Sequence, residues 1–230
     1  MKSMTNKSID PRKIIAALIC GMLGCVFMCS GDWLMMYGDT AYNGKVSWLT
    51  EGTAQIPAWR NLLSMLVAFP AIILYGIALF YIEKFIKNEK HAKIYHYLTA
   101  LGMTPWMLIH LYVVAVLHVF AVMRQGGYEG AFAVSEALHD QFVIVFFIAE
   151  AIMVLPFLYW FYLQFSGKTI LTKWMTFTNV IVIYALLKIV AVILPDTPFR
   201  IGFNNGLMSE SMFIWFGIML VWTVKNRGKL

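Results

Sequence analysis

Six long apolar stretches dominate the sequence and restrict what it can fold into. Each holds between about 18 and 27 residues, close to the length that an α-helix needs to cross the hydrocarbon core of a bilayer. Backbone polar groups in lipid must be satisfied within their own segment, so such stretches form helices. The predicted spans cover residues 14–36, 61–82, 97–123, 139–165, 174–194 and 207–224. The expected fold class is therefore all-α, an integral membrane bundle of six transmembrane helices that forms a single domain over residues 1–230.

The composition agrees with this class and excludes an ordinary soluble domain. Hydrophobic residues make up 60% of the chain and charged residues only 13%, and the mean hydropathy is +0.71. The net charge of +6 does not indicate nucleic-acid binding, because the basic residues lie in short segments between the spans. All three cysteines lie in the first stretch, which gives no disulfide framework and no cysteine-based metal site.

The distribution of lysine and arginine predicts the orientation in the membrane. The N-terminal tail carries four of them, the link after the second span four, the link after the fourth span two and the C-terminus three, 13 in all. The links on the other side carry four: Lys45, Arg60, Arg124 and Arg200. By the positive-inside rule both termini are expected to be cytoplasmic, in a multi-pass protein of the cell membrane.

The third span holds two histidines, His110 and His118, within an otherwise apolar run. Ionisable groups at such depth are costly unless they face a partner or a water-filled cavity, so each one is a candidate functional residue. A spacing of eight places the two side chains about 80° apart around a helix and about 12 Å apart along it, so both can line one cavity. The alternative is that each histidine only bonds to a neighbouring helix and serves packing.

Other polar side chains of the spans gather at a similar depth on the predicted extracytoplasmic side. The residues expected at this level are Asp32, Asn61, His118, Lys188 and Glu210. Glu150 lies deeper, near the level of His110. These positions predict a polar cavity that opens to the extracytoplasmic side and is floored by His110 and Glu150. Each residue alone also has a structural alternative, such as snorkelling of Lys188 or a buried ion pair.

Glu150 is the most deeply placed carboxylate of the chain. A glutamate that faced lipid near the midplane would cost several kcal/mol. We therefore expect Glu150 to face the bundle interior and to form a hydrogen bond with His110 or Lys188.

The sequence gives little support for a metal or a catalytic serine. The two membrane histidines lack the i, i+4 spacing of a ligand pair, and there is no His-Glu-x-x-His and no Gly-x-Ser-x-Gly. No metal site is predicted and no cofactor can be named. Serines within spans usually bond to their own backbone, so none is singled out as a nucleophile.

The segment Ser30-Gly31-Asp32-Trp33-Leu34 resembles the Gly-Asp-x-x-Leu element of lysoplasmalogenase-type membrane proteins. Those proteins also carry a histidine near a tyrosine in a later span, although His110 and Tyr112 are two positions apart here rather than three. The resemblance implies that Asp32 and His110 form a catalytic polar pair. The similarity covers a handful of residues, and that family has more than six spans. As a whole the chain is more similar to uncharacterised bacterial multi-pass membrane families.

Two classes of function remain open. The first is a membrane-embedded enzyme that acts on a lipid or amphiphile by acid/base chemistry. Its candidate catalytic residues are Asp32, His110, His118 and Glu150, and its candidate substrate-binding residues are Lys188, Arg200, Glu210 and Asn61. The second is a transporter or a ligand-binding protein in which the same cavity takes a small molecule or couples to protons. The expected partners are membrane lipids and an amphiphilic small molecule, with no nucleic acid.

Overall fold

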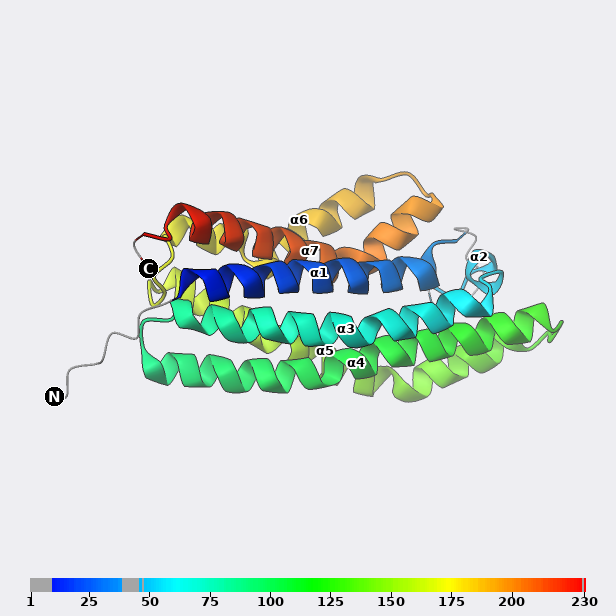
Figure 1. Ribbon diagram of the computed structural model, residues 1–230. Coiled ribbons are helices and arrows are strands. Elements are labelled where there is room, and N and C mark those ends of the chain that lie inside the picture. The colour runs from blue at the N-terminus through cyan, green and yellow to red at the C-terminus, as the bar shows by residue number, and fades with distance from the viewer. Residues whose placement is uncertain (1–9, 39–45, 47, 229) are drawn as a thin grey trace.

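The computed structural model describes residues 10–38, 46, 48–228 and 230. These residues form helices and turns, and none of them lies in a named strand. Figure 1 shows the long helices side by side along one common axis. In chain order the elements are α1 (Pro11–Met36), α2 (Glu51–Ala54), α3 (Ala58–Ile82), η1 (Glu83–Phe85), α4 (Glu89–Gln125), α5 (Ala131–Phe165), η2 (Lys173–Thr178), α6 (Val180–Ile193) and α7 (Pro198–Lys225).

Five segments are long and apolar enough to cross a membrane: α1, α3 together with η1, α4, α5 and α7. The chain is therefore an all-helical protein of the multi-pass membrane type. We call the end of the bundle that holds Pro11 and Lys225 the termini end. The opposite end, with α2 and the α4–α5 turn, is the loop end (Figure 1).

The span predicted over 174–194 differs from the other five. It is divided into the 3₁₀-helix η2 and the 14-residue α6, which is roughly 21 Å long and falls short of the bilayer core by itself. The division occurs at Asn179, whose backbone is extended and whose side chain accepts a hydrogen bond from Ile181 N. Asparagine competes in this way for backbone donors, which favours a cap over a continuous helix.

Two predicted connections turned out to be mainly helical. Residues 199–206, which lie between the fifth and sixth predicted spans, belong to α7. This helix begins at Pro198 because proline fits the first helical position and Thr197 caps the helix. The link expected over 124–138 is reduced to a tight turn, in which Gly127 has a φ of 76°.

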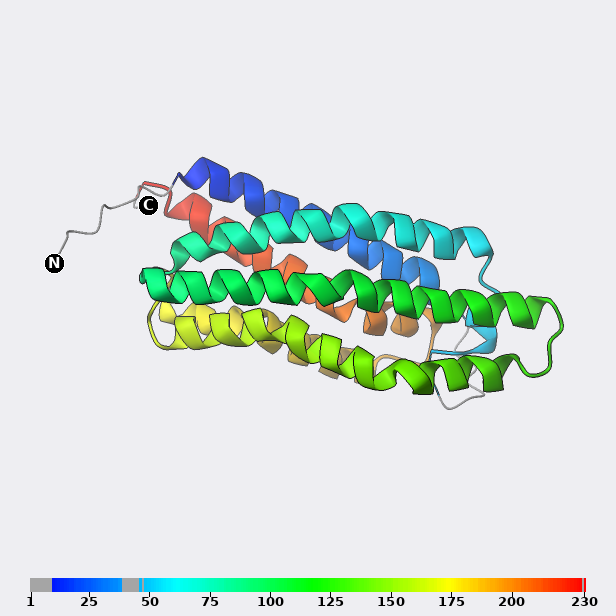
Figure 2. The same cartoon turned by 90° about the horizontal axis from the view of Figure 1, so that it is seen from below.

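As a result α4 and α5 contain 37 and 35 residues and extend beyond the other helices at the loop end (Figure 2). The loop before α3 is anchored to this extension. Arg124 forms a bidentate ion pair with Glu51, at 2.8 Å to each carboxylate oxygen. Gln125 donates to the carbonyl oxygens of Ala54 and Ile56.

Helix α1 packs between α3 and α7, and glycines make the close approach to α3 possible (Figure 1). A Cβ at Gly24 would lie 2.9 Å from the carbonyl oxygen of Ala71, and a Cβ at Gly21 would lie 2.5 Å from Cβ of Ala78. Small residues at helix interfaces are characteristic of membrane bundles, where packing replaces the hydrophobic effect between helices.

The space between α5 and α7 is closed toward the termini end and open toward the loop end. In the closed half α5 contacts α7 through aromatic rings: Phe157 and Trp160 each lie 6.0 Å, centroid to centroid, from Trp215. Nearer the loop end α5 and α7 line a cavity instead of touching, and α6 contributes to its wall. This opening holds the candidate site.

Candidate functional site

An aspartate and a histidine meet inside the bundle. The Nδ1 atom of His110, from α4, lies 3.3 Å from Oδ1 of Asp32, from α1. Their side chains are 4% and 13% exposed, so the pair is largely screened from solvent. A charge-assisted contact of this kind is strengthened by the low dielectric of the interior. The two residues that the resemblance paired are therefore neighbours in the structure.

The position before the aspartate lets the imidazole approach α1. A Cβ at Gly31 would lie 3.3 Å from Cε1 of His110 and 3.3 Å from the carbonyl oxygen of Ser64. Such contacts are tighter than ordinary packing, so Gly31 leaves the room in which the ring lies against the helix.

The other imidazole nitrogen faces α3. Nε2 of His110 lies 3.1 Å from Oγ of Ser64 and 3.2 Å from the carbonyl oxygen of the same residue. When Nε2 carries a proton it donates to the carbonyl, and when it does not it accepts from the hydroxyl. Ser64 can thus serve both protonation states of His110.

The order Asp32, His110, Ser64 matches the order of groups in a catalytic triad. Ser64, however, is fully buried and does not line the cavity that His110 faces. A nucleophile must reach its substrate, so this serine orients the imidazole and does not attack.

This interpretation gives a prediction for Ser64→Ala. The variant should fold and lose about 1 kcal/mol of stability, since the backbone carbonyl still accepts from Nε2. A fluorophosphonate probe, which labels activated serines, should leave both the parent protein and the variant unlabelled. Labelling of the parent that disappears in Ser64→Ala would instead assign a nucleophile.

The cavity beside the pair, here called the central cavity, has a volume of about 290 Å³. Its walls come from α1, α4, α5, α6 and α7 and from Trp48. Its polar or ionisable side chains are Asp32, His110, Glu150, Tyr184, Lys188, Asn204, Asn205 and Ser209. Lys188 donates a hydrogen bond to Oδ1 of Asn204 at 2.6 Å. The central cavity therefore presents an amine, carboxylates and an imidazole to whatever enters it.

A second cavity of about 240 Å³ adjoins it toward the loop end. We call it the vestibule. Trp48, Asn204 and Asn205 line both spaces. Arg200 also lines the vestibule, and its guanidinium forms an ion pair with Asp196 at 2.6 Å. Two cationic side chains, Arg200 in the vestibule and Lys188 in the central cavity, therefore lie between the loop end and the imidazole of His110.

Glu150 faces the central cavity, as expected, and lies beside Tyr184 of α6. The expected hydrogen bond to His110 or Lys188 is absent: within the described part of the chain, the Glu150 carboxyl group has no hydrogen-bond or ion-pair partner. The reason is geometric, because Lys188 is engaged with Asn204 and both imidazole nitrogens are occupied by Asp32 and Ser64. Glu150 thus remains available to a ligand.

The expected cluster of Asp32, His118, Lys188 and Glu210 is only partly formed. Asp32 and Lys188 line the central cavity, but Glu210 faces a separate space. Positions that follow one another in a helix point about 100° apart, so Ser209 reaches both spaces while Glu210 turns away from Asp32. The Oε1 atom of Glu210 accepts hydrogen bonds from Nε1 of Trp33 at 3.4 Å and from Sγ of Cys29 at 3.7 Å.

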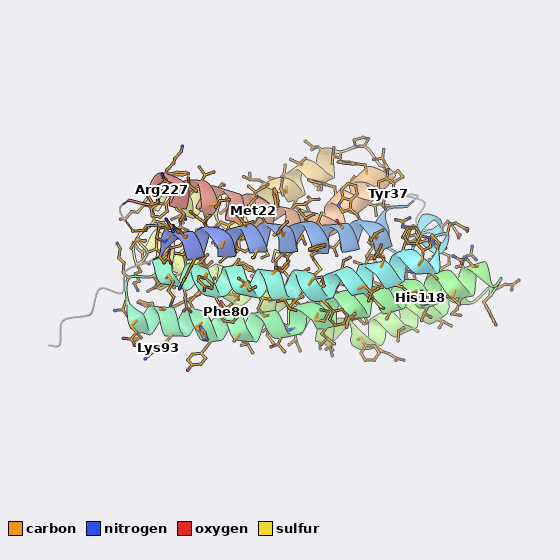
Figure 3. The ribbon with its side chains drawn as sticks, viewed as in Figure 1. Met22, Tyr37, Phe80, Lys93, His118 and Arg227 are labelled. Carbon is orange, nitrogen blue, oxygen red and sulfur yellow. The ribbon has the colours of Figure 1, made fainter. Side chains whose placement is uncertain are left out.

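The separate space is a lateral groove of about 860 Å³ between α1 and α7. Its lining is Cys25, Val26, Cys29, Ser30, Trp33, Leu34, Tyr37, Arg60, Leu187, Phe203, Ser209, Glu210, Phe213 and Ile214. Figure 3 labels Tyr37, which marks the loop end of this groove on α1.

His118 and Asn61 line neither space. His118 lies further along α4 toward the loop end (Figure 3), and its Nδ1 atom is buried without a hydrogen-bond partner among the described residues. Asn61 is buried on α3, and both of its amide atoms lack partners in the same described set. The sequence does not show which way each of these side chains points. Over residues 10–38, 46, 48–228 and 230, no group of three or more His, Cys, Asp or Glu side chains could hold a metal ion.

Several contributors were missed from the sequence, among them Ser64, Asn204 and Tyr184. Ser64 lies 46 positions from His110, and no local pattern connects them. Asn204 falls in a segment that was expected to be a connection. Tyr184 could have been found, since it lies four positions before Lys188 and so on the same face of a helix.

Comparison with known proteins gives one match. The chain matches the family described as "Family of unknown function (DUF6796)" over residues 1–227. No curated protein and no solved structure matches the chain. The resemblance to lysoplasmalogenase-type proteins remains a prediction, and it is looser than expected, since Leu34 stands one position before the leucine of that element.

Proposed function

The chain belongs to this family of unknown function, DUF6796, and on that premise we propose that it is a membrane-embedded enzyme that acts on an anionic amphiphile by acid/base chemistry. One observation carries the proposal: the paired Asp32 and His110 lie at a polar cavity within an otherwise apolar bundle. Burying such a pair costs free energy, so a purely structural bundle has little reason to keep it.

In this proposal Asp32 and His110 handle the proton together. The substrate meets the pair at the Asp32 carboxylate, because both ring nitrogens of His110 are engaged, and His110 exchanges the proton with that carboxylate. Histidine is a common general acid and base in enzymes. Positioned general acids and bases typically accelerate a reaction by about 10²–10⁴-fold. Glu150, which has no partner of its own within the described residues, would accept or supply a proton at a second atom of the substrate.

The cationic side chains give the class of substrate. Lys188 in the central cavity and Arg200 in the vestibule would attract and hold an anionic group. The central cavity, at about 290 Å³, fits a headgroup and little more. The apolar part of the amphiphile would stay in the surrounding membrane.

We further propose that the loop end faces the extracytoplasmic side of the cell membrane, with both termini cytoplasmic. The support is the 13 to 4 distribution of lysine and arginine across the links. This orientation requires six crossings, in which η2 and α6 together make the fifth. The vestibule would then open to the extracytoplasmic side.

Cysteine labelling tests this orientation. In a chain whose three native cysteines are replaced, Tyr128→Cys at the α4–α5 turn should react with an impermeant thiol reagent from the extracytoplasmic side. Lys93→Cys, at the exposed termini end of α4 (Figure 3), is the matched control and should react only after the membrane is opened. Reaction of the Tyr128→Cys variant from the cytoplasmic side alone would reverse the orientation.

A second function rests on a different observation, the interruption at Asn179. Transporters commonly form their substrate sites with discontinuous helices, and α6, which carries Tyr184 and Lys188, is a short helix preceded by such a break. In that case the central cavity would bind the same anionic molecule and release it unchanged on the other side.

Mass spectrometry separates the two functions. Purified protein is reconstituted with a total membrane lipid extract, and lipid and water-soluble fractions are compared before and after incubation. The enzyme proposal expects a product that forms with the parent and is missing with the Asp32→Asn, His110→Asn double variant. Transport of an unaltered molecule into vesicles, with no product in any fraction, would replace the enzyme by the transporter.

A further inference from the structure

The lateral groove has the length of one leaflet. It follows α1 from Cys25 to Tyr37, a distance of roughly 18 Å along the helix axis. Half of the hydrocarbon core of a bilayer measures roughly 15 Å. The groove therefore has the length needed for a single acyl chain that reaches from the interface toward the midplane.

Its open side faces outward from the bundle. Val26 is 50% exposed, Phe213 39% and Ile214 38%. In a membrane these side chains contact lipid, and an apolar channel of about 860 Å³ is filled by hydrocarbon in preference to water. The apolar lining therefore favours an acyl chain in the groove.

Arg60 at the mouth indicates the headgroup. Its Nη2 atom donates to the carbonyl oxygens of Trp33 at 3.2 Å and Tyr37 at 3.0 Å, which fixes the guanidinium at the loop end of α1. Across the described residues no carboxylate pairs with Arg60. A guanidinium that is held in place and lacks an anion is suited to bind a phosphate by bidentate hydrogen bonds.

We propose that the lateral groove binds an anionic phospholipid, with one acyl chain between α1 and α7 and the headgroup phosphate on Arg60. Among the described residues that line the groove, Arg60 is the one cation, so the phosphate is held at the mouth and the chain points inward. This site is separate from the Asp32–His110 pair and does not depend on the proposed acid/base chemistry.

Native mass spectrometry of the purified chain tests the proposal. The protein is titrated with phosphatidylglycerol and, separately, with diacylglycerol of the same chains, which lacks the phosphate. Arg60→Gln should weaken phosphatidylglycerol binding about tenfold, the effect of one lost charge-assisted bond. Arg227→Gln removes the same charge beyond the end of α7 and should bind like the parent.

A second variant tests the acyl chain. Ser30 is exposed and lines the groove, so Ser30→Trp should fill the channel, keep Arg60 intact and also weaken binding. A melting measurement of each variant confirms that the fold is kept. Soluble glycerol 3-phosphate should not compete with phosphatidylglycerol for the groove. Competition at equal concentration would show that the site binds a phosphate and not a lipid. The proposal would be overturned if diacylglycerol bound as well as phosphatidylglycerol, or if Arg60→Gln bound phosphatidylglycerol like the parent. A dimer that Ser30→Trp dissociates would also overturn it.

Discussion

Replacing His110 with leucine should destabilise the protein by about 1–3 kcal/mol, the usual cost of leaving a buried polar group without its hydrogen-bond partner. The physical reason is that Asp32, whose side chain is 13% exposed, would be left without its imidazole partner inside the bundle. The free energy of unfolding in mixed detergent and sodium dodecyl sulfate micelles gives the measurement.

Two further variants show whether the effect belongs to the pair. The double variant Asp32→Leu, His110→Leu should be more stable than His110→Leu alone, because it removes the unpaired carboxyl group as well. His118→Leu is the matched control on the same helix and should cost much less, since His118 has no ion-pair partner among the described residues. If the double variant loses as much stability as Asp32→Leu and His110→Leu lose together, the two side chains do not interact.

Gly24→Ala should destabilise the bundle by about 1–3 kcal/mol, the range for overpacking a closely packed interface. The new methyl group would lie 2.9 Å from the backbone oxygen of Ala71 and 3.0 Å from the Tyr75 ring, so α1 and α3 must separate. The free energy of unfolding in mixed detergent and sodium dodecyl sulfate micelles measures this loss of stability.

Gly217→Ala on α7 is the control, because the nearest atom to its Cβ is the end of the flexible Met22 side chain at 3.7 Å. With that space available, replacing a helical glycine by alanine should be neutral or stabilise by up to about 1 kcal/mol. Opposite signs at the two glycines are therefore expected. Similar effects at both would mean that the α1–α3 contact is looser than described.

Much of the fold could be predicted from the sequence because membrane helices follow from length and hydropathy. Five of the six predicted spans correspond to helices long enough to cross. The errors lie where local capping competes with hydropathy: Asn179 divides the fifth span, and Thr197 with Pro198 starts α7 earlier than its apolar run suggests. Hydropathy averages over many residues and cannot detect a single cap.

The site was harder to predict because depth does not determine direction. Asp32, His110, Glu150 and Lys188 were placed at useful depths, and all four line the central cavity. Glu210 was expected at the same depth as Asp32 and Lys188, but its side chain faces the lateral groove. His118 lines neither the central cavity nor the lateral groove. The direction of a side chain depends on how its helix is rotated against the neighbouring helices. That rotation is set by contacts between helices, such as Gly31 against His110. The sequence of a single segment does not contain this information.

The central claim, that His110 transfers protons for a reaction in the central cavity, is tested most directly by comparing two histidine variants. The rate of conversion of the substrate found by mass spectrometry is measured for the parent, His110→Asn and His118→Asn in the same lipid. The account predicts that His110→Asn loses at least about 100-fold in rate, the lower range for a general acid or base, while His118→Asn keeps the rate of the parent. Equal rates for His110→Asn and the parent would contradict it.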